Sequence, residues 1–124
     1  SSMGLLRFFQ ASERQEDQEE EQLSTITTLT ATKGQYEGSK IEFDGSVVIG
    51  RDPACSELII DDNNVSRMHC TITFDPQDHT YIVTDHSTNG TFIGRERIEK
   101  GKSRIVPKGT FIIIGQSGNN FRLD

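Results

Sequence analysis

The chain has 124 residues, enough for one domain with a hydrophobic core, and no apolar stretch that would predict a membrane span or a signal peptide. Hydrophobic residues make up 32% of the chain, charged residues 26%, and the net charge is −6. Most of this charge lies in residues 1–22, which hold six acidic residues against two arginines, so residues 23–124 are close to neutral. A near-neutral domain argues against a nucleic-acid binder, which would carry a basic face.

Residues 1–22 are predicted to be an acidic tail that is separate from the domain at 23–124. From Ala11 to Gln22 the tail is rich in Glu and Gln, which is typical of a solvated linker or of a helix packed on a neighbour. The apolar run Leu5–Phe9 is too short to cross a bilayer. A linker, a partly helical segment and the remainder of a membrane anchor therefore stay open for this stretch.

Residues 23–124 are predicted to form an all-β sandwich of two antiparallel sheets, with roughly ten or eleven short strands. Apolar and β-branched runs alternate with turn residues about every 8–12 positions, without a helical period. Strands are expected at 24–32, 40–43, 47–49, 58–60, 70–74, 81–83, 91–94, 97–98, 105–106, 111–114 and 120–123. Asp44-Gly45 predicts a tight hairpin between the second and third of them. In an aligned sandwich the loops cluster at two ends, so we expect ligand-binding loops at one end.

Three polar stretches stand at predicted strand ends. Gly50-Arg51 ends one strand, Asn64–Cys70 leads into another, and Ser87–Thr91 follows a third. The middle stretch places Ser66, Arg67 and His69 within four residues. Because a hydroxyl donor and a guanidinium at one loop tip are suited to hold an anion, this stretch predicts an anion site.

The stretches Val48–Arg51, Val65–His69 and Asp85–Thr91, in this order, resemble a forkhead-associated (FHA) domain. Pro107–Thr110 followed by Ile112–Gly115 is also similar, although the family often has an acidic residue where Thr110 stands. The resemblance covers residues 24–124. It implies a β-sandwich whose loops at one end bind a peptide of a partner protein that contains phosphothreonine. It also implies a serine/threonine kinase that phosphorylates this partner.

The resemblance also implies a role for each site residue. The positions that would contact the phosphate or the peptide are Arg51, Ser66, Arg67, Thr88 and Asn89. Those that would support the site are Gly50, His69 and Gly90, with His69 bracing the loop of Ser66. Asn64, close to Asp61 and Asp62, would influence selection beyond the phosphate, and we expect it to disfavour an acidic residue three places after the phosphothreonine.

The chemistry of these residue types fits such a ligand. Phosphothreonine carries nearly two negative charges and three strong acceptor oxygens. An arginine presents a planar fork of donors that matches two of those oxygens. The carboxamide of Asn89 is able both to donate to and to accept from an extended peptide. The acidic run Glu13–Glu21, which holds no threonine, is expected to compete weakly with this ligand for Arg51 and Arg67.

Other kinds of function are weaker interpretations of the same residues. A hydrolase would need Ser66, His69 and Asp85 as a triad, but no Gly-x-Ser-x-Gly elbow is present. The cysteines and histidines lack zinc-like spacing, so no metal or cofactor is expected. The main rival is a module of this fold that binds partners without phosphate, through a sheet face or the apolar tail, with a second basic surface at Arg95–Arg104. We expect a non-catalytic, cytoplasmic module, alone or as the cytosolic part of a larger or membrane-attached protein.

Overall fold

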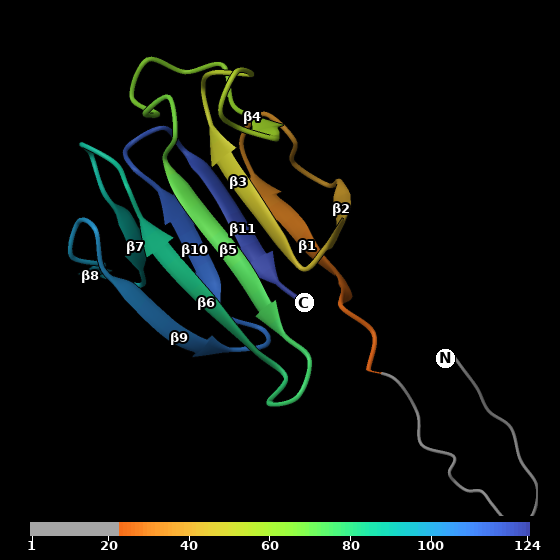
Figure 1. Cartoon of the computed structure of the whole chain (residues 1–124). Coiled ribbons are helices and arrows are strands. Elements are labelled where there is room, and N and C mark those ends of the chain that lie inside the picture. Colours follow the sequence, from red (N-terminus) through yellow and green to blue (C-terminus); the bar gives the residue numbers. More distant parts are fainter. Residues whose placement is uncertain (1–22) are drawn as a thin grey trace, which may run out of the picture.

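The computed structural model describes residues 23–124 and shows two β-sheets packed face to face (Figure 1). The strands are β1 (Ile26–Lys33), β2 (Lys40–Asp44), β3 (Ser46–Gly50), β4 (Leu58–Ile59), β5 (Cys70–Asp75), β6 (Thr80–Asp85), β7 (Thr91–Ile93), β8 (Glu96–Arg97), β9 (Ser103–Pro107), β10 (Phe111–Ile114) and β11 (Asn119–Leu123). One sheet has the order β2-β1-β11-β10-β7-β8 and the other β4-β3-β5-β6-β9. The predicted all-β sandwich is confirmed. Its pairs are antiparallel except for β3 and β4, which run parallel.

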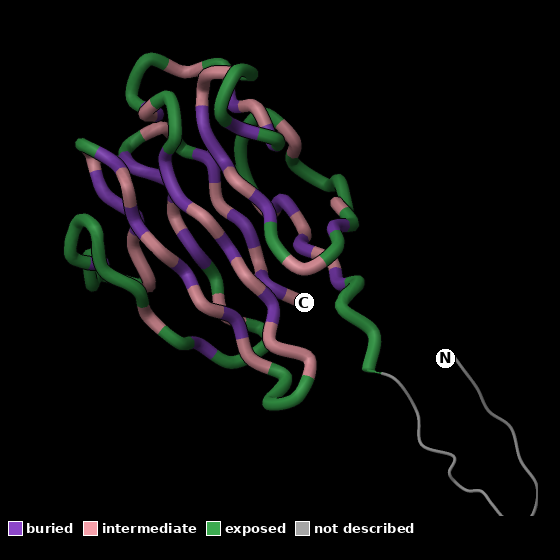
Figure 2. The backbone as a smooth tube through the Cα atoms, viewed as in Figure 1, coloured by how far each residue is buried: buried purple, intermediate pink, exposed green. Residues whose placement is uncertain are grey.

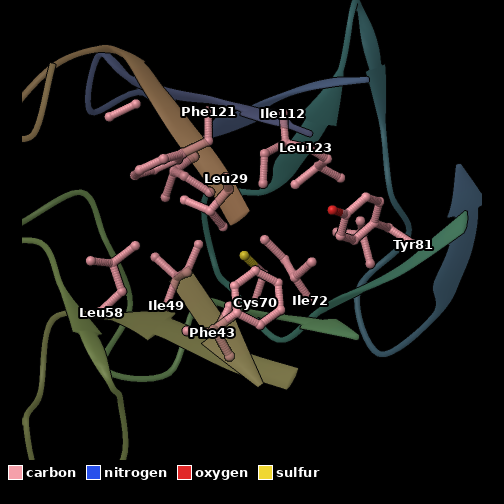
Figure 3. Packing of buried hydrophobic residues seen from close by; sticks show 14 of the residues in the cluster. Leu29, Phe43, Ile49, Leu58, Cys70, Ile72, Tyr81, Ile112, Phe121 and Leu123 are labelled. Carbon is pink, nitrogen blue, oxygen red and sulfur yellow. The ribbon is translucent and has the colours of Figure 1, made fainter. Parts of the chain in front are cut away.

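The core lies between the two sheets and follows the alternation of the sequence. Along β5 and β6 buried residues alternate with half-buried ones (Figure 2). Ile72 of β5 and Leu29 of β1 are fully buried, and Figure 3 shows them among the side chains that fill the space between the sheets. Burying one such side chain contributes about 1.5–3 kcal/mol, so these positions hold the sheets together.

Cys70 also belongs to this core. Its side chain is fully buried, and burial raises the pKa of the thiol to about 12. A thiol in this environment behaves as a small apolar side chain. Within residues 23–124 no group of three or more His, Cys, Asp or Glu side chains is arranged to hold a metal ion.

The predicted hairpin between residues 40–43 and 47–49 is wrong. β2 pairs with β1, with Thr27 opposite Phe43, whereas β3 pairs with β5 in the other sheet. Gly45 makes the predicted tight turn at φ +77°, but its backbone joins the two sheets. Its N–H donates to Thr25 O at 2.9 Å, and its carbonyl accepts from Phe74 N at 2.8 Å. The Asp-Gly signal identified the turn, while burial of Phe43 and Val47 between the sheets determined which strands pair.

The loops divide between the two ends of the sandwich. The segments after β3, before β5 and after β6 lie together at one end, and the turns after β5 and β9 lie at the other (Figure 1). No helix long and apolar enough to span a membrane is found in the described part of the chain. The first 22 residues, including the predicted tail and its expected competition with the ligand, lie outside the described residues.

Candidate functional site

Three loops at one end of the sandwich are tied together by direct hydrogen bonds. We call them the Arg51 loop (51–57), the Ser66 loop (60–69) and the Asn89 loop (86–90). Arg51 N donates to Ser66 O at 3.0 Å, which joins the first two. Thr88 N donates to Ser66 Oγ at 3.1 Å, and Asn89 Nδ2 donates to Asn64 O at 2.9 Å, which joins the last two. The structure thus brings together residues that the sequence separates by almost 40 positions.

Two arginines stand on the loops of this junction, Arg51 on one and Arg67 on the next. Among the residues that the structure describes, the guanidinium of Arg51 makes one hydrogen bond, from Nε to Val65 O at 2.9 Å. This bond fixes the guanidinium and uses only its Nε–H, so that its two terminal amino groups remain for a ligand. Arg67 is exposed on the neighbouring loop, and its carbonyl accepts from Asp52 N at 3.2 Å and from Ser56 Oγ at 2.6 Å.

His69 lies beneath the junction and joins the Ser66 loop to the Asn89 loop. Its fully buried ring accepts from Ser66 N through Nδ1 at 3.1 Å and donates from Nε2 to Gly90 O at 2.8 Å. This pair of bonds requires the neutral ring with its proton on Nε2. Burial lowers the pKa of His69 below its ordinary value of 6.5, against the opposing effects of the bond to Gly90 and the charge of Asp85.

The pKa of His69 predicts a loss of stability in mild acid. A protonated ring has no acceptor for Ser66 N, and the unfolded chain binds the proton more readily than the folded one. The contribution of His69 should therefore be complete above pH ~6.5 and decline as the pH falls through the lower folded-state pKa. Urea unfolding at several pH values between 7.5 and 5 measures this slope. His69→Gln should cost about 2 kcal/mol at pH 7.5 and flatten the slope.

His79 offers the matched control for this measurement, because it is an exposed histidine at the other end of the sandwich. The variant His79→Gln should keep the slope of the original chain. A slope that is the same in the original chain and in His69→Gln would contradict the role assigned to His69.

Asp85 and Ser87 hold the Asn89 loop in a way that sequence reasoning missed. The buried Asp85 Oδ1 accepts from Ser87 Oγ at 2.6 Å, from Ser87 N at 3.2 Å and from Thr91 Oγ1 at 2.8 Å. Ser87 Oγ in turn accepts from Gly90 N at 2.7 Å. The Asp-x-Ser spacing is a known signal for such a side-chain turn and would have identified this pair.

The same bonds separate the members of the triad that a hydrolase would need. His69 contacts the backbone N–H of Ser66 and not its hydroxyl, which accepts from Thr88 N instead. The carboxylate of Asp85 is engaged by Ser87 and Thr91. The three side chains therefore support loops and do not form a proton relay.

Comparison with known proteins identifies the family of this fold and site. The family model of the FHA domain matches residues 47–115. The chain therefore belongs to the FHA domain family, as the sequence motifs predicted. The matched segment runs from β3 to the end of β10 and includes all three loops.

One curated relative is a probable serine/threonine-protein kinase, fhkA, of Dictyostelium discoideum. It is 35% identical over an alignment of 85 residues, and the match covers 63% of this chain and 14% of the kinase. The solution structure of the FHA domain of an Arabidopsis thaliana hypothetical protein has a TM-score of 0.70 at 22% identity and covers 85% of this chain and 91% of that one. A structure from an analysis of phosphothreonine-dependent FHA domain interactions has a TM-score of 0.62 at 28% identity. This match covers 81% of this chain and 98% of the other chain.

Proposed function

We propose that this domain binds phosphothreonine in a partner protein and thereby recruits that partner to whatever the domain is attached to. The observation that carries the proposal is the bonded junction of the three loops. It places the guanidinium of Arg51, the hydroxyl of Ser66 and the carboxamide of Asn89 at one surface. Membership in the FHA family and the likeness to a domain studied for phosphothreonine-dependent interactions support it.

Each group of the site has a stated task in this proposal. Arg51 and Ser66 hold the phosphate, and Arg67 and Thr88 contribute at its edge. A doubly charged phosphate gains most from donors that are fixed before it arrives, and the bond from Arg51 Nε to Val65 O provides such fixing. Asn89 uses one amide hydrogen on Asn64 O, while its second amide hydrogen and its carbonyl serve the main chain of the peptide.

The proposal assigns no catalytic step to this domain. The relative fhkA carries a kinase name, but this chain spans only 14% of its length. A separate serine/threonine kinase phosphorylates the partner protein in the same compartment. We propose that this compartment is the cytoplasm. Recruitment of a phosphorylated partner is therefore the activity to test.

A calorimetric titration of the full chain with degenerate peptide pools tests the proposal. One pool carries phosphothreonine at a fixed position, and its twin carries unmodified threonine there. We expect binding of the phosphorylated pool on the order of micromolar, or ~8 kcal/mol. The unmodified pool should give no heat. Equal binding of both pools, or of neither, would contradict phosphothreonine recognition and favour a phosphate-independent interaction module.

A further inference from the structure

The basic cluster that the sequence suggested as a second binding surface lies beside the site. We call it the basic strip and define it by the exposed side chains Arg95, Arg97, Lys100 and Lys102. These residues stand on β8 and on the segments around it, at one edge of the sandwich. Arg104 is not included, because it is paired with Glu96 at 3.0 Å. One further carboxylate, Glu99, lies within the segment.

Direct contacts make the basic strip continuous with the Asn89 loop. Arg97 Nη2 donates to Thr88 O at 3.1 Å. A Cβ at Gly90 would stand 2.9 Å from Arg97 Nε. Because Gly90 has no side chain, the guanidinium of Arg97 packs directly against the backbone of the Asn89 loop. The turn that carries Lys100 and Lys102 is held next to the Asn89 loop by two bonds to Asp85, the last residue of β6. Asp85 N donates to Lys102 O at 3.1 Å, and Gly101 N donates to Asp85 O at 2.8 Å. The strip is thus a flank of the site and not a separate surface.

The opposite flank carries carboxylates. We call it the acidic rim and define it by Asp52, Asp61 and Asp62 on the loops on either side of β4. Two of them are held by backbone donors. Asp52 Oδ1 accepts from Ala54 N at 2.9 Å and Asp62 Oδ1 from Asn64 N at 2.8 Å. Their negative charges therefore have fixed positions beside the Arg51 and Ser66 loops.

The order of strands places these two flanks on opposite sides of the junction. In the five-stranded sheet β4 is one edge and β9 the other, with β3, β5 and β6 between them. β8 is the edge of the second sheet on the side of β9 (Figure 1). The Ser66 loop precedes β5 and the Asn89 loop follows β6, so a peptide that crosses both runs from the acidic rim toward the basic strip.

We propose that the site selects the order of charged residues along its ligand. The preferred peptide has basic residues on the side of its phosphothreonine that faces β4 and acidic residues on the side that faces β8 and β9. This inference rests on the proposed function and adds the sequence class of the ligand. The reverse arrangement places lysines against Arg97 and Lys102 and carboxylates against Asp61 and Asp62, which is repulsive on both flanks. Because the basic side chains and Asp61 are exposed and Asp52 and Asp62 are half-buried, salt screens these charges and the preference acts within about 10 Å at 0.1 M salt.

Two mirror-image peptides with identical composition test the inference on the full chain. Each has one phosphothreonine between alanines, with three glutamates on one side and three lysines on the other, and the order is reversed in the second. Fluorescence anisotropy at about 50 mM salt should give an affinity about 10-fold higher for one of them, with an uncharged phosphopeptide in between. At about 500 mM salt the difference should fall below about 2-fold.

A pair of variants with equal change in net charge supplies the control. Lys100→Gln/Lys102→Gln removes two charges from the basic strip and should reduce the preference to about 3-fold or less. Lys108→Glu changes the net charge by the same amount in the turn after β9, at the other end of the sandwich, and should keep the preference. Equal affinity of the two phosphorylated mirror peptides would overturn this inference and leave phosphothreonine recognition standing. Equal binding of the uncharged peptide with phosphothreonine and with unmodified threonine would instead overturn the proposed function.

Discussion

Replacing Arg51 with alanine should weaken binding of a phosphothreonine peptide by about 2–5 kcal/mol and leave the fold intact. The guanidinium is held by a bond from Nε to the carbonyl of Val65, so it reaches the phosphate without first losing conformational freedom. Its removal leaves a doubly charged group with hydroxyl and amide donors and with Arg67 at its edge. Calorimetric titration of the original chain and the variant with one phosphopeptide measures the loss.

Two further variants show whether the loss comes from the position and the fork of Arg51. Arg122→Ala removes the same charge from β11, where Arg122 is paired with Asp124 at 2.8 Å, and should keep the affinity within about 0.5 kcal/mol. Arg51→Lys keeps the charge but not the bidentate geometry, so its affinity should lie between those of the original chain and Arg51→Ala. If Arg51→Ala bound as well as Arg122→Ala does, Arg51 would not contact the phosphate.

Local patterns in the sequence predicted the strands well, because burial between two sheets imposes a period of two. In β5 the alternation of Cys70, Ile72 and Phe74 with threonines gave the strand and its inward face, and all three apolar side chains are buried. The pairing of β2 was not predicted. A turn signal describes a local conformation, whereas the choice of partner strand depends on which surfaces pack together.

The site shows the same division between local and tertiary information. The motifs predicted which stretches meet, and the structure brings Arg51, Ser66 and Asn89 to one junction. The bond from Asn89 Nδ2 to Asn64 O joins residues 25 apart, and no local spacing encodes it. The position of the basic strip was likewise out of reach, since it depends on β8 and β9 forming one edge of the sandwich. The assigned ligand contacts stay predictions that the titrations decide.

Gly50→Ala should destabilise the fold by about 3 kcal/mol, a large effect for one added methyl group. A Cβ at this position would lie well inside 3.0 Å of both Arg67 O and Ser56 Oγ, a distance that real Cβ atoms essentially never show. Arg67 O is a backbone atom that also accepts from Asp52 N and Ser56 Oγ, so it has no room to yield. The added carbon must therefore push the Arg51 and Ser66 loops apart. Urea unfolding measures the cost.

Gly101→Ala is the control that shows how much of the loss of stability comes from lack of space and how much from backbone conformation. Gly101 has φ +80°, and a Cβ at this position would meet nothing within 4 Å, so alanine there should cost about 1 kcal/mol through the backbone alone. Adding Ser56→Ala to Gly50→Ala should not restore stability, because the carbonyl of Arg67 still blocks the new carbon. A cost at Gly50 no greater than that at Gly101 would contradict the close approach of the two loops. The loss should also extend to phosphopeptide affinity, since the displaced loops carry Arg51 and Ser66.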